Sequence, residues 1–247
     1  MVTNLQYFFE TAKKLRGGRW VWVKDSNGEN RNNILLGGTI ANPNKGFGHL
    51  WAAQLMQYTP GQPMLIFRSF KLKVDATPNA TTIYIDGDGY SDAPEVGQYL
   101  MVAPDATEVV SMKANTDTGD VTVTKTAYKG TYAKVTGVTY DETNQKFEVT
   151  LENKLSTAKI NAGTILVEAD KAKDTESTGS APVLCPKPNV FNEADRDMLP
   201  TEGYGFQNAN YSVSGVYNKQ AWIAKMQPLP KYVLALNKSL IDGIFWI

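Results

Sequence analysis

The chain has 247 residues, of which 42% are hydrophobic and 20% charged, and its 25 basic and 25 acidic residues give a formal net charge of zero. This length fits one large or two small domains, and the composition is typical of a folded chain rather than a disordered one. The balanced charge, without a long run of Lys or Arg, argues against direct binding of DNA or RNA. No apolar run approaches the roughly 18 residues of a membrane-spanning helix, so we expect no membrane partner.

The N-terminal end predicts a short helix followed by a strand. Residues 3–15 follow a capping-box pattern with an apolar face that includes Phe8 and Phe9. This stretch lacks the uninterrupted apolar core of a secretion signal, so none is predicted. Residues 20–23, which contain Trp20 and Trp22, are expected to form a strand that ends at an Asn-Gly turn.

The next two elements are an expected helix and an expected strand. Apolar residues recur at intervals of three and four over residues 46–58, which predicts a second amphipathic helix ending at a Pro-Gly pair. Residues 64–74 predict a long strand, with one face buried and one in water. The expected buried residues in its second half are Phe70, Leu72 and Val74, and the expected wet ones are Ser69, Lys71 and Lys73.

The middle of the chain differs in composition from the two ends. All five Trp and eight of the nine Phe lie outside residues 76–170, which are instead rich in Thr, Val and Tyr. Several short strands with polar turns between them predict a small β-barrel or sandwich. The expected strands are residues 82–85, 98–102, 121–126, 131–140, 146–152 and 164–169. The charged, Ser/Thr/Gly/Pro-containing segment 171–182 is expected to be a linker or an exposed loop.

The C-terminal part predicts further β structure with bends, then a short helix from Pro230 to Leu236. The chain ends on four apolar side chains: Ile244, Phe245, Trp246 and Ile247. Burying four such side chains is worth roughly 6 to 12 kcal/mol, and leaving them in water invites aggregation. We therefore expect them to be covered by the same subunit or by a partner.

These elements together predict a mainly β fold with a few short helices. We expect residues 1–75 and 183–247 to form one aromatic-rich anchoring body from the two ends of the chain. Residues 76–170 are expected to form a separate β module, because large aromatic side chains supply the most burial energy and this range has almost none.

No catalytic constellation is recognisable, so neither an enzyme nor a cofactor is predicted. The single histidine, His49, lies in an apolar segment without a spaced Cys or carboxylate pair. The single cysteine, Cys185, lacks a nucleophile motif, excludes an intramolecular disulfide and fits a reducing cytosol. Glycine-rich phosphate loops are also missing. Chemistry by carboxylates alone, such as glycoside hydrolysis, stays open at this stage.

One segment is a weak candidate for calcium. Asp86, Asp88 and Asp92 stand two and four positions apart, a spacing that can direct several oxygens onto one ion. Ser91 replaces the glycine of the EF-hand pattern and Gly97 replaces its closing glutamate. A simple turn is the favoured interpretation.

The tyrosines of the chain suggest an alternative function, that of a carbohydrate-binding adhesin module that contacts a host glycan. Tyrosine rings can stack on sugars, although in β proteins they are more often core or edge residues. The candidates are Tyr90, Tyr99, Tyr204 and Tyr211. This function would need a concave aromatic face on the module.

A resemblance to a known family is found in the segments 134–138, 147–151 and 160–169, and in the tail 222–230 with the apolar end of the chain. They resemble the β module and C-terminus of head-decoration and head-fibre proteins of tailed phages of Bacteroidetes, including the crAss-like group. The resemblance covers about the last 115 residues and transfers no site residue. It implies a non-enzymatic structural subunit of the virion, made in the host cytoplasm, attached to the major capsid protein or another virion protein, and present as a trimer.

The residue pattern points to the same class. Apolar ends that need covering, a polar β module and neutral charge are what an anchored, projecting subunit requires. The residues expected at the interface are Phe8, Phe9, Trp20, Trp22, Ile244, Phe245, Trp246 and Ile247.

Overall fold

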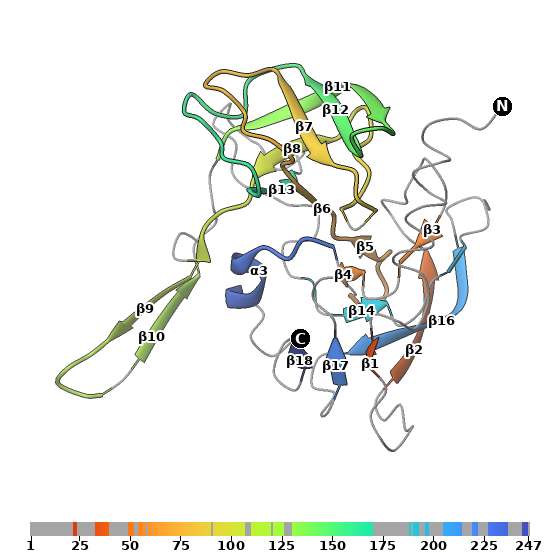
Figure 1. Ribbon diagram of the computed structural model, residues 1–247. Helices are drawn as coiled ribbons and strands as arrows, with labels where there is room; N and C mark the ends of the chain where they lie inside the picture. The colour runs from red at the N-terminus through yellow and green to blue at the C-terminus, as the bar shows by residue number, and fades with distance from the viewer. Residues whose placement is uncertain are drawn as a thin grey trace.

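The computed structural model describes part of the 247-residue chain. The described residues are 22–23, 33–39, 49–51, 54–57, 59–89, 91–106, 110–119, 121–125, 130–169, 188, 190–192, 196–197, 205–213, 219–221, 227–236 and 244–246. Strands dominate these residues, and the fold is mainly β, as the sequence predicts (Figure 1).

A six-stranded antiparallel barrel is the central unit of the structure. Its strands follow the order β6-β13-β8-β11-β12-β7. Their bounds are Ser69–Lys71 (β6), Ile165–Glu168 (β13), Tyr99–Val102 (β8), Tyr132–Asp141 (β11), Lys146–Leu151 (β12) and Thr82–Asp86 (β7). Leu72, directly after β6, forms an antiparallel bridge with Ile85 in β7, and Lys73 N donates to Tyr84 O at 2.8 Å. The two outer strands of the sheet therefore meet, and closure removes its free edges.

The barrel interior is filled with side chains. In β12 the buried residues Phe147, Val149 and Leu151 alternate with the exposed Glu148 and Thr150, as expected when one face of a strand points inward. The same buried cluster contains residues from the other barrel strands, residues from the segments between these strands, and Trp51 from before the barrel. Its members include Phe70, Leu72, Ile83, Ile85, Leu100, Ala133, Val135, Leu166 and Trp51.

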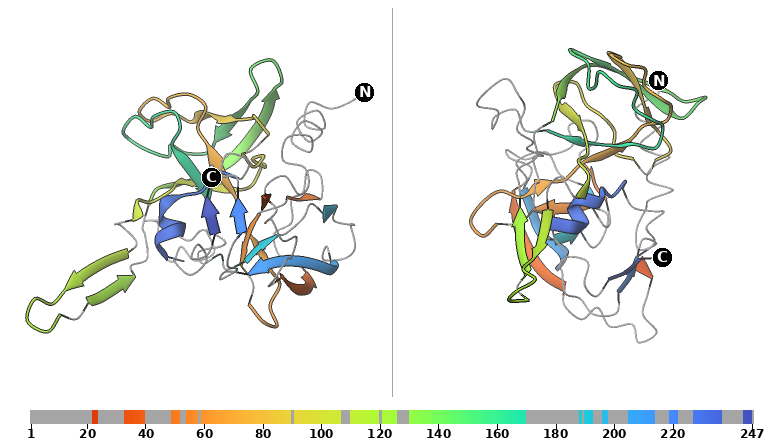
Figure 2. Two further views of the ribbon diagram at one scale, coloured as in Figure 1. Left: turned by 60° about the horizontal axis from the view of Figure 1, so that its bottom comes forward. Right: turned by 90° about the vertical axis from the view of Figure 1, so that its left-hand side faces the viewer.

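A two-stranded hairpin interrupts the chain between the barrel strands β8 and β11. It consists of β9 (Val110–Ala114) and β10 (Val121–Lys125), paired antiparallel. In Figure 1 and in the left view of Figure 2 the hairpin extends away from the barrel. The sequence predicts β10 but not β9.

The remaining strands form three sheets, and each sheet contains strands from both ends of the chain. One five-stranded sheet has the order β2-β16-β14-β4-β5, a second sheet pairs β15 with β3, and a third has the order β1-β17-β18. The bounds are Trp22–Val23 (β1), Asn33–Thr39 (β2), His49–Leu50 (β3), Leu55–Gln57 (β4), Leu65–Ile66 (β5), Val190–Asn192 (β14), Arg196–Asp197 (β15), Gly205–Val213 (β16), Lys219–Ala221 (β17) and Ile244–Trp246 (β18). Each of these sheets thus combines strands from before residue 67 with strands from after residue 189. We call these three sheets the terminal body.

The helix predicted over residues 46–58 is wrong. This segment forms β3, which pairs with β15, and β4, which lies between β14 and β5. Pairing with strands far along the chain overrides the helical spacing of its apolar residues, because tertiary contacts outweigh local propensity.

The single long strand predicted over residues 64–74 is also wrong, because it is divided in two. β5 belongs to the terminal body, whereas β6 belongs to the barrel. Phe70 and Leu72 are buried as expected, but Val74 is 42% exposed and Ser69 is fully buried. The barrel consequently begins at β6, before the range 76–170 expected for the module.

Helix α3 (Lys231–Leu236) follows Pro230, where the sequence predicts a helix. The predicted helix at residues 3–15, the turn after residue 23 and the linker at 171–182 lie outside the described residues.

Candidate functional site

The acidic segment at the end of β7 is engaged by lysines and backbone amides. Asp86 is 6% exposed, and its two oxygens lie 3.1 Å from Lys71 Nζ and 3.0 Å from Lys73 Nζ. Asp88 Oδ1 accepts a hydrogen bond from Ser91 N. Two ammonium groups thus neutralise the Asp86 carboxylate, a role that competes with cation binding.

Asp92, the third residue of the calcium candidate, points to a different partner. Its Oδ2 accepts from Ser69 N at 3.1 Å. Within the part of the chain that the structure describes, no group of three or more His, Cys, Asp or Glu is arranged to hold a metal ion. Asp86, Asp88 and Asp92 therefore engage separate partners, and the weak calcium candidate stays a prediction.

A buried ion pair lies between the barrel and the terminal body. Arg68 stands between β5 and β6, and its Nη1 lies 2.8 Å from Oε2 of Glu168, the last residue of β13. The two residues are 4% and 7% exposed. Burial raises the pKa of the Glu168 carboxyl, Arg68 opposes that rise, and the nearby charges of Glu95 and Asp92 add to it. A carboxylate so placed serves as a structural partner of Arg68.

Gln227, in the C-terminal segment, is a further buried polar residue near the start of the barrel. Its side-chain Nε2 donates to Phe67 O at 3.1 Å and to Ser69 Oγ at 3.2 Å, while its Oε1 accepts from Leu55 N at 3.3 Å. Ser69 Oγ in turn donates to Pro228 O. One buried glutamine therefore joins the chain before β6 to the segment that leads into α3.

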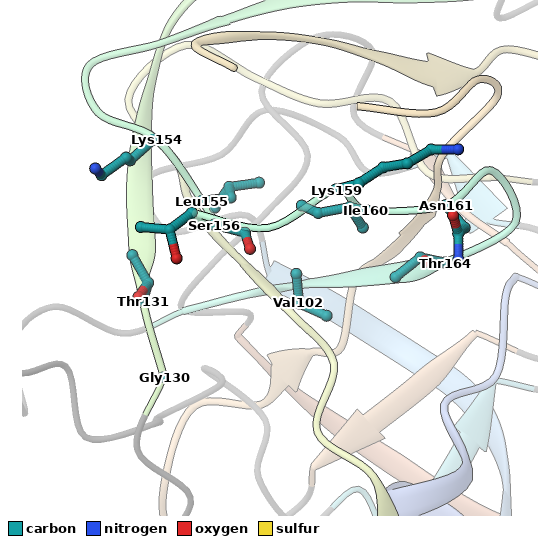
Figure 3. Close-up of a pocket in the computed structure, with 11 residues that line it drawn as sticks. Val102, Gly130, Thr131, Lys154, Leu155, Ser156, Lys159, Ile160, Asn161 and Thr164 are labelled. Carbon is teal, nitrogen blue, oxygen red and sulfur yellow. The ribbon is translucent and has the colours of Figure 1, made fainter. Parts of the chain in front are cut away.

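A pocket of about 550 Å³ opens beside the barrel, under the segment 154–161 (Figure 3). Its lining combines aliphatic side chains with hydroxyl, amide and ammonium groups. The described lining residues are Val102, Gly130, Thr131, Lys154, Leu155, Ser156, Thr157, Lys159, Ile160, Asn161 and Thr164. This volume lies in the range of small-molecule sites.

The two lysines of the pocket are held by partners outside the lining. Lys159 Nζ lies 2.6 Å from Asp75 Oδ2, and Lys154 Nζ donates to Asn79 Oδ1 at 2.9 Å. Figure 3 shows both ammonium groups pointing away from the pocket centre. The described lining contains no carboxylate, histidine, cysteine or aromatic ring, so its chemistry is that of hydrogen bonding over an aliphatic floor.

The residues predicted at the interface fall partly in one small sheet. Trp22 lies in β1, and Ile244, Phe245 and Trp246 make up β18. β17 lies between these strands, with Ala221 paired to both Trp22 and Trp246. Sequence reasoning treated these segments separately, and no sequence pattern indicated that they share a sheet. Phe8, Phe9, Trp20 and Ile247 lie outside the described residues.

The other candidate residues are dispersed. His49 lies in β3, opposite Asp197 of β15. Tyr99 packs edge-on against Tyr132 on the adjacent strand, with ring centroids 5.7 Å apart. Tyr211 lies in β16. Tyr90, Cys185 and Tyr204 are outside the described residues.

The Arg68–Glu168 pair and the pocket are the features that sequence reasoning missed. A signal for the pair was present, since Arg68 follows the apolar run 64–67 and Glu168 ends the apolar strand β13, but nothing in the sequence relates two positions so far apart. The pocket depends on how the loop 152–164 crosses the barrel.

No family model, no curated protein and no solved structure matches this chain. Among the helices of the described residues, none has the length and apolar character needed to cross a membrane.

Proposed function

We propose that this chain is a non-enzymatic structural subunit of a phage virion, a head-decoration or head-fibre protein. It attaches through the terminal body and carries the barrel outward. The observation that carries this proposal is the placement of β1 and β18, which share a sheet through β17, whereas the barrel lies at the other end of the view in Figure 1. Segments from both ends of the chain thus meet in one place, away from the barrel.

The barrel surface supports an outward role. Among the described side chains, the exposed large hydrophobic ones are Val74 and Val96. A closed barrel also lacks the free strand edges that promote unintended pairing. Such a unit can stand in solvent on a particle surface without associating through its edges.

The buried polar groups support a structural rather than a catalytic role. The buried Glu168 carboxylate, whose pKa is raised, is engaged by Arg68. Perturbed titratable groups mark active sites when they face a cleft, and Glu168 is not among the described residues of the pocket. The assignment to the phage head and the capsid partner rests on the sequence resemblance.

The test is the composition of purified particles. Peptides of this chain should be present in washed, nuclease-treated particles of the phage that encodes it, at a fixed ratio to the major capsid protein. Peptides of the phage polymerase serve as the control for contamination. A chain that is abundant in infected cells but falls to the polymerase level in the particles contradicts the proposal.

The pocket favours a second candidate function, binding of a host glycan. Hydroxyl and amide groups over an aliphatic floor can hold a polar ligand, although the concave aromatic face expected from the sequence is not found in the described lining. Asn161→Ala is the informative variant, and Asn144→Ala, in an exposed turn outside the pocket, is its control. Binding on a glycan array that Asn161→Ala removes and Asn144→Ala keeps would support this function. An array without binding by the native chain would contradict it.

A further inference from the structure

The β9–β10 hairpin is a sheet of two strands that no other described strand joins. Isolated two-stranded sheets are marginally stable in water, because half of their backbone groups face outward and one layer buries little surface. Figure 1 and the left view of Figure 2 show the hairpin extending from the molecule. A hairpin in this position gains stability if a further strand pairs with it.

The turn at the hairpin tip is well defined. Gly119 N donates to Asn115 O at 2.9 Å, and Asp117 N donates to Asn115 Oδ1 at 3.0 Å. Gly119 has φ +74°, a conformation that suits glycine. This local geometry fixes the register of the two strands, which places Val121 opposite Ala114 and Lys125 opposite Val110.

The two outer edges of the hairpin differ in sequence. Proteins protect exposed edge strands with charges, prolines or bulges. β9 carries Lys113 near its middle and is approached by helix α3. In β10, residues 121–124 form an uncharged run of Val and Thr, the β-branched residues that favour strand pairing. The edge of β10 is therefore the less protected one.

We propose that β10 pairs antiparallel with β10 of a second copy of this chain, about a two-fold axis at Val123. In this register Val123 faces Val123 of the second copy, and Thr122 faces its Thr124. Val121 faces Lys125 of the second copy. The two hairpins then form one continuous four-stranded sheet in the order β9-β10-β10-β9.

The sequence of β10 favours its own copy as the partner. Residues with odd numbers pair with odd ones, so the Val positions of both copies share one face and the Thr positions share the other. Thr–Thr cross-strand pairs are stabilising, and the arrangement brings no like charges opposite each other. The zero net charge of the chain also imposes little repulsion between copies. A two-fold contact of this kind is self-complementary.

The contact lies outside the terminal body and has two-fold symmetry, so it goes beyond the proposed function. The β10–β10 contact can join two single chains, and it can equally join two larger assemblies of the chain. In both cases the mass of the assembly is an even multiple of the 27.2 kDa chain.

Two variants with substitutions at the same positions test the register. In T122E/T124E, the new glutamate at position 122 faces the new glutamate at position 124 of the second copy, so like charges oppose pairing. Within the hairpin, position 122 lies opposite Lys113 and position 124 lies opposite Ser111, so neither glutamate faces a like charge on β9. T122E/T124K keeps the first substitution but places opposite charges across the two-fold axis.

Light scattering of the purified full-length chain gives the readout. We expect the mass of T122E/T124E to be half that of the native chain, and T122E/T124K to keep the native mass. The difference between the variants should shrink in high salt, which screens exposed charges. A native chain that is an odd multiple of 27.2 kDa overturns the proposal. Two variants of equal mass overturn it as well, whichever mass they share.

A cross-link provides a second measurement. Paired residues in antiparallel strands lie within the Cα separation of a disulfide. Val123→Cys in a Cys185→Ser background should form a disulfide-linked dimer on oxidation, whereas Thr118→Cys at the exposed tip should not. Equal cross-linking at both positions contradicts the register. Detection of the chain in phage particles is a separate result, so the two proposals can fail independently.

Discussion

Arg68 and Glu168 are 100 positions apart in the sequence, yet their side chains form a buried ion pair of 2.8 Å. Arg68 lies between the last strand of the five-stranded sheet and the first strand of the barrel, and Glu168 closes barrel strand β13. The pair therefore sits where the chain passes from the terminal body into the barrel. Two charges at this junction fix the path of the chain more than they stabilise it, since desolvation offsets most of their attraction.

Replacing one member of this pair should lower the free energy of unfolding, whereas replacing both members should change it little. We expect Arg68→Met or Glu168→Met to lower the free energy of unfolding by about 3 to 5 kcal/mol, because each leaves a buried charge without its ion-pair partner. The double variant should come within about 1 kcal/mol of the native chain or exceed it. Urea denaturation of the four proteins measures the coupling. Additive losses in the double variant would show that the pair does not act as a unit.

The stability of the protein should depend on pH through Glu168 in a defined direction. Its pKa in the folded state lies above the ordinary value of 4.5, mainly through burial. The folded state then holds a proton where the unfolded chain has lost it. The contribution of Glu168 is therefore fully present below about pH 4.5 and is lost as the pH rises through the folded-state pKa.

Asp75 provides the opposite case. The hydrogen bond from Lys159 and that from Ala162 N lower its pKa below 3.8, so its contribution is present above that value and is lost on acidification. Urea unfolding of the native chain, Glu168→Gln and Asp75→Asn across about pH 3 to 8 separates the two effects. The free energy of unfolding of the native chain minus that of Glu168→Gln should fall as the pH rises. The free energy of unfolding of the native chain minus that of Asp75→Asn should rise with pH. Parallel curves for all three proteins would contradict both assignments.

Gln227 should hold the C-terminal segment against the strands β4 and β6. Its replacement by Ala removes the hydrogen bonds to Leu55 N, Phe67 O and Ser69 Oγ. Leaving buried polar groups without these partners should cost about 1 to 3 kcal/mol. Limited proteolysis should then cut the segment around residue 227 faster than in the native chain. Lys231→Ala, at an exposed position in α3, is the control, and equal cleavage of both variants would count against this role.

Gly87 should not tolerate a side chain. A Cβ at this position would lie 2.6 Å from Tyr140 Cε2 and 3.0 Å from backbone atoms of Gln145 and Lys146. Gly87→Ala should therefore lower the free energy of unfolding by about 1 to 3 kcal/mol, the usual cost of overpacking.

Gly137→Ala is the matched control for Gly87→Ala. Its Cβ would approach Thr150 no closer than 3.4 Å, which is an ordinary contact. Thermal unfolding of both variants should show the larger loss at position 87. A loss at position 137 that equals or exceeds it would show that crowding at Tyr140 is not the cause.

The sequence by itself determined the elements that depend on local pattern. The strands at residues 82–86, 132–141 and 146–151 alternate apolar and polar residues and are separated by polar turns, and the structure places each of them within a residue or two of the prediction. The helix after Pro230 was predictable for the same reason, because proline fixes the first turn. The mainly β class follows from these elements.

Only the tertiary structure decided how distant segments combine. Residues 49–57 have helical spacing but form strands because β14 and β15 supply partners about 140 positions later. Closure of the barrel through Leu72 and Ile85, the union of β1 and β18 around β17, and the Arg68–Glu168 pair also join residues that no local pattern relates. Local periodicity reports only which face of an element is apolar. Which other element covers that face is set by the whole chain, through long-range hydrogen bonds and shared burial.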